Sequence, residues 1–117
     1  MKVKEMIEKL NLELLTKDVS EDALYAEVEA GYVSDLLSNA MGQGQPAMVW
    51  VTMQGHQNVA AVASLIGFAA VIVAGDAPVA ADTIHKANMN DVVIAATEEP
   101  TFDIVGKLYA MGIGNKQ

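Results

Sequence analysis

48-MVWVTMQGHQNVAAVASLIGFAAVIVAG-75 is the stretch that decides the fold. Residues 48–52 and 69–74 are short, nearly continuous apolar runs, which are typical of parallel strands covered on both faces. Between them, Val59, Val62 and Ile66 recur at the spacing of one helical face. The stretch therefore predicts a strand, helix, strand crossover. Its polar turn, residues 54–58, lies where open parallel sheets usually place their ligand sites.

The remaining segments extend this alternation into one small sheet. With 117 residues, the chain is long enough for one core and too short for a second. The pattern predicts helices over residues 3–10, 35–41, 80–87 and 101–111, a third buried strand over 92–96, and a half-exposed strand over 27–33. We therefore expect a single α/β domain, residues 1–117, with three layers and a small, mostly parallel sheet.

Several local signals predict where these elements begin and end. Ser34 suits an N-cap, with Asp35 in the first helical turn, and Gly42 suits the end of that helix. Residues 16–22, TKDVSED, predict a polar turn, and residues 12–15 predict a short strand or packing segment. Gly112 followed by Ile113 is typical of a glycine C-cap, and we expect the tail, residues 114–117, to be loose.

Composition excludes several classes of function. The fifteen acidic and seven basic residues give a net charge of −8, and every basic residue is a lysine, so nucleic-acid binding is disfavoured. The absence of cysteine excludes disulfides, thiol nucleophiles and thiolate-held zinc or iron–sulfur clusters, and we expect no cofactor. The charged, amphipathic residues 1–10 are not a secretory signal, so we expect a cytoplasmic location. Residues 59–74 are shorter than the roughly 20 residues of a membrane span, so we expect no membrane contact.

Polar residues follow the carboxyl ends of the predicted strands and are expected to face one crevice. Amides at the start of the helix near residue 58 would attract an anion there, and a glycine in the turn would allow a ligand to approach closely. The candidate ligand-binding residues are Asp35, Thr52, Gln54, Gly55, His56, Asn58 and Asp76, with Glu98 facing the same crevice. Alternatively, Asn58 only caps the helix and His56 is a solvated loop residue. His85 is expected on the outer surface of its helix.

The familiar catalytic and metal-binding patterns are absent. The turn lacks the lysine of a phosphate-binding loop, and the serines lack a nucleophile-elbow context. Asp35, Asp76, Glu98 and Glu99 would suit a divalent cation if they converged, but their spacing matches no metal loop, so we favour solvated carboxylates. An enzyme would require His56 to pair with Asp35 or Asp76 as a general acid and base.

Four segments in order carry a family resemblance. They are GYVSDLLS at residues 31–38, VWVTMQGHQNVAAVA at 49–63, AAVIVAG at 69–75 and GKLYAMGI at 106–113. Together they resemble the stand-alone DRTGG-domain proteins, a family similar to the N-terminal domain of HPr kinase/phosphorylase. Related domains regulate phosphotransacetylases and CBS-domain pyrophosphatases. The chain departs from the family at residues 55–58, where Gly-His-Gln-Asn replaces the Asp-Arg pair of the family motif.

The resemblance implies a regulatory domain rather than an enzyme. Related domains help their chains to dimerise, so it implies a homodimer, and similar single-domain members carry hydrogenase labels, which implies an enzyme partner. Without cysteine, this chain cannot carry an iron–sulfur cluster itself. Two hypotheses follow: a non-catalytic regulatory and dimerisation module linked to a hydrogenase or other metabolic enzyme, or a sensor of an anion or nucleotide that binds at residues 52–58.

Overall fold

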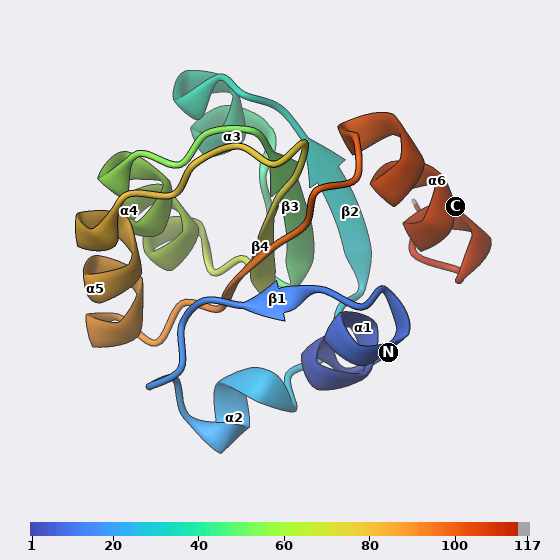
Figure 1. Cartoon of the computed structure of the whole chain (residues 1–117), viewed down its shortest axis with the longest axis horizontal. Coiled ribbons are helices and arrows are strands. Elements are labelled where there is room, and N and C mark those ends of the chain that lie inside the picture. The colour runs from blue at the N-terminus through green and yellow to red at the C-terminus, as the bar shows by residue number, and fades with distance from the viewer. Residues whose placement is uncertain (115–117) are drawn as a thin grey trace.

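The computed structural model describes residues 1–114, and these residues build one five-stranded sheet (Figure 1). Its strand order is β1-β5-β4-β3-β2, and the four strands β2 to β5 are parallel, whereas β1 pairs antiparallel with β5. The strands are β1 (Glu13–Leu14), β2 (Ala30–Val33), β3 (Met48–Thr52), β4 (Ala70–Val73) and β5 (Ile94–Ala96). The expected α/β fold with a small, mostly parallel sheet is confirmed.

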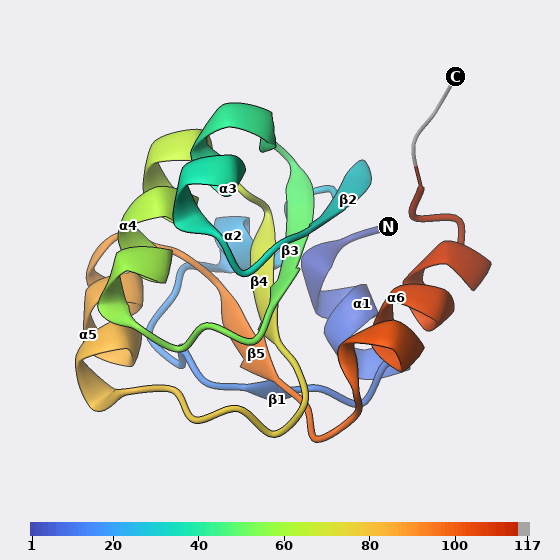
Figure 2. The same ribbon diagram turned by 90° about the horizontal axis from the view of Figure 1, so that it is seen from above.

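Helices cover both faces of this sheet (Figure 2). The helices are α1 (Val3–Lys9), α2 (Glu21–Leu24), α3 (Leu37–Gln43), α4 (Gln57–Ile66), α5 (Ala81–Met89) and α6 (Thr101–Ala110). Figure 2 shows α3, α4 and α5 on one side of the sheet and α1 and α6 on the other. Because β2 to β5 follow one another across the sheet, crossovers of one hand place all three connecting helices on the same face.

Alternation along the strands divides the apolar residues between two cores. In β3, Val49 and Val51 pack with α1 and α6, whereas Trp50 packs with α3 and α4. In β4, Ile72 joins the first core and Val71 the second. Since successive strand side chains point to opposite faces, the apolar runs read from the sequence supply both cores at once.

Trp50 anchors the core beneath α3 and α4. Its side chain is fully buried, its ring centroid lies 5.2 Å from that of Phe68, and its Nε1 donates a hydrogen bond to the carbonyl oxygen of Ser34 at 2.9 Å. Tyr32 of β2, the cross-strand neighbour of Trp50, also stacks on Phe68 and bonds to Asn39 of α3. The aromatic cluster therefore fixes α3 against the edge of the sheet.

The start and end of α3 differ from the prediction. Its N-cap is Leu36, not Ser34, whose hydroxyl accepts instead from the amide of Leu36 at 3.0 Å. Asp35 lies before the helix because its carboxylate is bound to the end of β3. The helix ends at Gln43 rather than Gly42, and Gly44 follows it where a Cβ would overlap Phe68 and lie 2.6 Å from a carbonyl of α3.

The segment before β2 is more ordered than a polar turn. Thr16 is fully buried, and its Oγ1 accepts a hydrogen bond from the amide of Ile94 at 3.1 Å, next to the β1–β5 pairing. Ser20 then caps α2, which begins at Glu21 inside the predicted turn. The prediction of a polar turn is wrong here, because the hydroxyl groups of Thr16 and Ser20 form hydrogen bonds with other parts of the chain rather than with water.

Other expectations agree with the structure. The helix over residues 3–10 and the glycine at the end of α6, Gly112 with φ 95°, are confirmed, and Ile113 is buried in the core beneath α6. The half-exposed strand predicted over residues 27–33 is shorter and spans Ala30–Val33. His85 is exposed on α5 as expected. In residues 1–114, no helix is long and apolar enough to cross a membrane. The expectation of a loose tail lies, from residue 115 onward, outside the described residues.

Asp91 holds the start of α2 and provides a test by pH. Its carboxylate accepts from the hydroxyl of Ser20 at 2.6 Å and from the Ser20 amide at 2.7 Å, and these bonds hold the pKa of Asp91 below its ordinary value. A depressed carboxyl pKa contributes stability that is complete above the unfolded-state pKa and is lost as pH falls through the folded-state pKa.

We expect Asp91→Asn to lower the free energy of unfolding at neutral pH by about 1 kcal/mol, after allowance for solvent screening. Asparagine tolerates the positive φ of 57° at this position, so the backbone is not strained by the change. Urea unfolding across the acid range should show the difference from the wild type shrinking as Asp91 becomes protonated. A difference that is constant with pH would contradict this role for the carboxylate.

Candidate functional site

The turn between β3 and α4 is built by its histidine. His56 is the N-cap of α4, and its Nδ1 accepts a hydrogen bond from the amide of Asn58 at 3.1 Å. Asn58 is therefore the second helical residue and not the cap, which corrects the alternative drawn from the sequence. Because Nδ1 accepts here, the neutral form of the ring has its proton on Nε2, which makes no hydrogen bond within residues 1–114.

Gly55 brings two loops together. A Cβ at this position would overlap the carbonyl oxygen of Pro78 and lie 2.9 Å from the Cα of Val79. The carbonyl of Gly55 accepts from the hydroxyl of the buried Thr83 at 2.6 Å and from the amide of Ala80 at 3.3 Å. The close approach that this glycine allows is therefore to the loop before α5 rather than to a ligand.

A shallow hollow of about 410 Å³ lies between these two loops. Its lining residues are Met53, Gln54, Gly55, His56, Pro78, Val79 and Ala80, with no charged residue among them. The first residues of α4 and α5 follow His56 and Ala80, so the positive ends of two helix dipoles lie next to the hollow. A negatively charged group would find partial positive charge here but no lysine or arginine among the lining residues.

Asp35 and Thr52 are close together, as predicted, but they bind each other. Asp35 Oδ1 accepts from the Thr52 hydroxyl at 2.9 Å and from the amide of Met53 at 2.8 Å. The Thr52 side chain is buried, and its oxygen also accepts from the amide of Gln54 at 3.1 Å. This network shapes the entry to the turn and occupies the buried Thr52 hydroxyl and one oxygen of the exposed Asp35 carboxylate.

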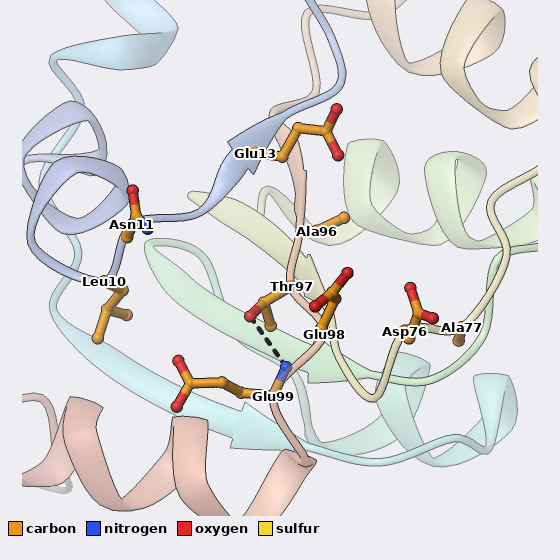
Figure 3. Close-up of a pocket in the computed structure, with 9 residues that line it drawn as sticks. All are labelled: Leu10, Asn11, Glu13, Asp76, Ala77, Ala96, Thr97, Glu98 and Glu99. Atoms are coloured by element: carbon orange, nitrogen blue, oxygen red, sulfur yellow. Dashed lines mark hydrogen bonds between the residues drawn. The ribbon is translucent and has the colours of Figure 1, made fainter.

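Asp76 lies in a second hollow, of about 420 Å³, beyond the ends of β4 and β5 (Figure 3). Backbone bonds tie the two outgoing loops together, from Gly75 to the carbonyl of Glu99 at 2.7 Å and from Asp76 to that of Thr97 at 3.0 Å. The chain then turns to α5 on one face and to α6 on the other, and such a divergence is where open α/β sheets usually bind ligands.

Carboxylates dominate this second hollow. Figure 3 shows Asp76 and Glu98 side by side, whereas Glu99 points away from them; its carboxylate bonds to Lys107 at 2.6 Å. Asn11 and Glu13 complete the wall from the β1 segment. The expected single crevice is therefore wrong. Gln54, Gly55 and His56 line the uncharged hollow, and Asp76 and Glu98 line the acidic one. Asp35, Thr52 and Asn58 line neither.

The structure forms neither of the two other sites considered from the sequence, a metal site and a general acid and base pair. Within residues 1–114, no three histidine or acidic side chains are grouped so that they would hold a metal ion. In the same residues, no hydrogen bond or ion pair joins His56 to Asp35 or Asp76, so the general acid and base pair is not formed.

Sequence reasoning missed the contribution of β1 to the acidic hollow. The alternation of Leu12, Glu13 and Leu14 marks a strand, but nothing in the pattern places it beside β5. The antiparallel pairing of Glu13 with Ala96 is a tertiary contact across more than half of the chain. Periodicity reports which side of an element is buried and not which neighbour buries it.

No protein-family model and no curated protein matches the sequence. Among solved structures, the chain is similar to the CBS and DRTGG domains of the regulatory region of Clostridium perfringens pyrophosphatase, in complex with the activator diadenosine tetraphosphate. The TM-score is 0.73 at 12% identity, and the match covers 90% of this chain and 44% of that chain. The chain thus spans less than half the length of the matched structure. The likeness shows a DRTGG-like α/β fold.

The contact between Gly55 and Pro78 provides a test of how the turn is held. We expect Gly55→Ala to lower the free energy of unfolding by about 1–3 kcal/mol, because the new methyl group forces the two loops apart. Gly42→Ala is the matched control: a Cβ there meets nothing within 4 Å inside α3, and it should stabilise the chain by about 0.5–1 kcal/mol. Thermal and urea unfolding measure both. Equal effects of the two substitutions would refute the close approach.

Proposed function

We propose that this protein is a non-catalytic regulatory module that acts through protein association, first of all as a homodimer. The DRTGG-like fold supports this proposal. The neighbouring structure is a regulatory region. Regulation of that kind requires a surface that another chain recognises, rather than a centre that holds reacting groups.

Exposed apolar side chains are the observation that carries the proposal. Large hydrophobic residues with about half or more of their surface exposed include Val33, Leu36, Phe102 and Tyr109. Val33 is the last residue of β2, Leu36 is the N-cap of α3, and Phe102 and Tyr109 belong to α6, the helix beside β2 (Figure 1). Val33 and Tyr109 line one apolar groove between β2 and α6. Other elements carry similarly exposed residues, namely Tyr25, Met41, Met53, Leu65 and Met89. Apolar residues that line one groove are typical of interaction sites, whereas singly scattered ones are not.

An enzyme partner is the further part of the proposal. The family resemblance points to a hydrogenase or another metabolic enzyme, and this partner remains a prediction that no comparison tests. A non-catalytic module would change the activity of such an enzyme through its differential affinity for two states of the partner.

We expect the chain to form a reversible dimer at micromolar concentration, because two apolar surfaces of this kind lose their contact with water on association. Sedimentation velocity over a wide range of concentration would show the weight-average mass rising from that of one chain to that of two. Mass that stays at 12.4 kDa at the highest concentration would contradict self-association.

A sensor of an anion or nucleotide is the second candidate function. The uncharged hollow favours it, because His56 lines this hollow beside two helix N-termini and no lining carboxylate repels a phosphate group. Of the seven candidate residues, Gln54, Gly55 and His56 line this hollow, whereas Asp35, Thr52, Asn58 and Asp76 do not. The first three are therefore the contacts that we propose for the ligand.

His56 allows the ligand and the helix cap to be tested separately. Diadenosine tetraphosphate, ATP and inorganic phosphate serve as probes, and a probe at about 100 times its dissociation constant should stabilise the wild type by roughly 2.7 kcal/mol. His56→Ala removes the cap, which costs about 1 kcal/mol without any ligand. His56→Asp keeps a cap acceptor but repels anions, so it should fold at least as well and lose the shift in melting temperature. No shift with any probe, or an equal shift in His56→Asp, would rule out this candidate.

A further inference from the structure

We infer that the carboxyl end of the sheet is a docking surface for a different protein, one that presents lysine or arginine side chains around apolar ones. This inference rests on the association with a partner protein proposed above, not on the homodimer, and it names the surface and the chemistry of the partner. The surface, here called the carboxyl-end surface, comprises Asp35, Leu36, Met53, Asp76, Glu98 and Phe102.

Large apolar side chains are exposed at this end of the sheet. Leu36, shortly after β2, is 67% exposed, Met53, directly after β3, is 48% exposed, and Phe102, in the first turn of α6, is 87% exposed. Because β2, β3, β4 and β5 are parallel neighbours, the segments that follow them leave the sheet at one end (Figure 1). Apolar side chains that are this exposed lose their contact with water when another surface covers them, which favours association.

Contacts between the outgoing loops join these residues into one surface. The carboxylate of Asp35, the residue before Leu36, accepts a hydrogen bond from the amide of Met53 at 2.8 Å. The methyl group of Met53 lies against Gly75, where a Cβ would be 3.0 Å from it. The amide of Gly75 donates in turn to the carbonyl of Glu99 at 2.7 Å, in the connection that leads to α6. A line of bonded or touching segments therefore runs from the end of β2 to the start of α6.

The carboxyl-end surface is acidic. The four segments that join a parallel strand to its following helix contain no lysine, and with the first turns of α5 and α6 they carry the acids Asp35, Asp76, Asp82, Glu98, Glu99 and Asp103. On the neighbouring helices, Lys107 pairs with Glu99 at 2.6 Å and Lys9 pairs with Glu5 at 3.4 Å. The N-termini of α3 to α6 contribute roughly half a unit of positive charge each, which offsets only part of the acidic charge.

The acidic hollow offers a place for a cationic side chain. Glu13, Asp76 and Glu98 line its volume of about 420 Å³, and Asp76 and Glu98 lie side by side (Figure 3). Within residues 1–114, no three acidic or histidine side chains are grouped closely enough to hold a metal ion. An ammonium or guanidinium group donates hydrogen bonds in several directions and does not require such close grouping.

Charge and apolar surface together select the partner. The carboxylates repel nucleic acid and anionic membranes, and in a symmetric contact with a second copy they would face themselves. A small cation would neutralise the carboxylates but leave Leu36, Met53 and Phe102 in contact with water. A protein face with lysine or arginine around apolar side chains is complementary to both features of the surface.

A synthetic peptide serves as the probe for this partner. It forms an amphipathic helix of about 14 residues, with leucine on one face and lysine on the other. Two control peptides replace every lysine by glutamate or every leucine by serine. Anisotropy of a dye on the peptide, titrated with the full chain, measures the dissociation constant. We expect the leucine and lysine peptide to bind about tenfold more tightly than either control.

Matched substitutions test whether binding occurs at the carboxyl end. Glu98→Lys and Glu29→Lys change the net charge equally, but Glu29 precedes β2 at the opposite end of the sheet. Phe102→Ser is compared with Leu65→Ser, in the last turn of α4, where the side chain is 70% exposed. All four side chains are exposed, so each variant should fold. We expect Glu98→Lys and Phe102→Ser each to weaken binding about tenfold, and the two controls to leave it within about twofold.

Several outcomes would overturn the inference. Equal binding of a control peptide, or equal weakening within either pair of substitutions, would show attraction without this surface. Failure of the leucine and lysine peptide to bind the wild type would also overturn it and would not bear on the homodimer. Sedimentation of the chain without peptide measures self-association, so the failure of that proposal is observed separately.

Discussion

The constant hand of the crossovers is the constraint on which the rest of the structure depends. Four parallel strands follow one another across the sheet, so α3, α4 and α5 must share one face. The other face is left to the two ends of the chain, α1 and α6, and the core on that face requires both of them. Among the connections that leave β2 to β5, only the one after β5 leads to the opposite face of the sheet, where it forms α6. The fold thus concentrates its connecting helices on one side and its irregular features at the edges of the sheet.

This change from one face of the sheet to the other explains why the polar residues at the carboxyl ends of the strands do not form one site. The loops after β3 and β4 are pressed together through Gly55, whereas the loops after β4 and β5 part toward opposite faces. One hollow is therefore uncharged and bordered by helix N-termini, and the other collects Asp76, Glu98 and Glu13. One hollow is uncharged and the other is acidic, so proximity along the sheet edge does not mean shared chemistry.

The strands and most helices were predictable from the sequence because burial on both faces leaves long apolar runs, as in residues 48–52 and 69–74. Helix ends were not predictable, because several residues can compete for the same backbone groups. Asp35 suits a first helical turn but binds Thr52 and Met53 instead, and His56 takes the cap expected of Asn58. The pairing of β1 with β5 and the exposure of the β2 edge depend on contacts distant in sequence, which periodicity does not report.

The single tryptophan has a practical consequence. The side chain of Trp50 is fully buried between β3 and α3, so its fluorescence reports whether this core is folded. Contacts made at the surface of the molecule do not reach it. Fluorescence will therefore follow denaturation cleanly and remain silent during contacts made along the sheet rim or in the shallow hollows. Complex formation by this chain has to be observed by mass, by isotope exchange or with an extrinsic dye.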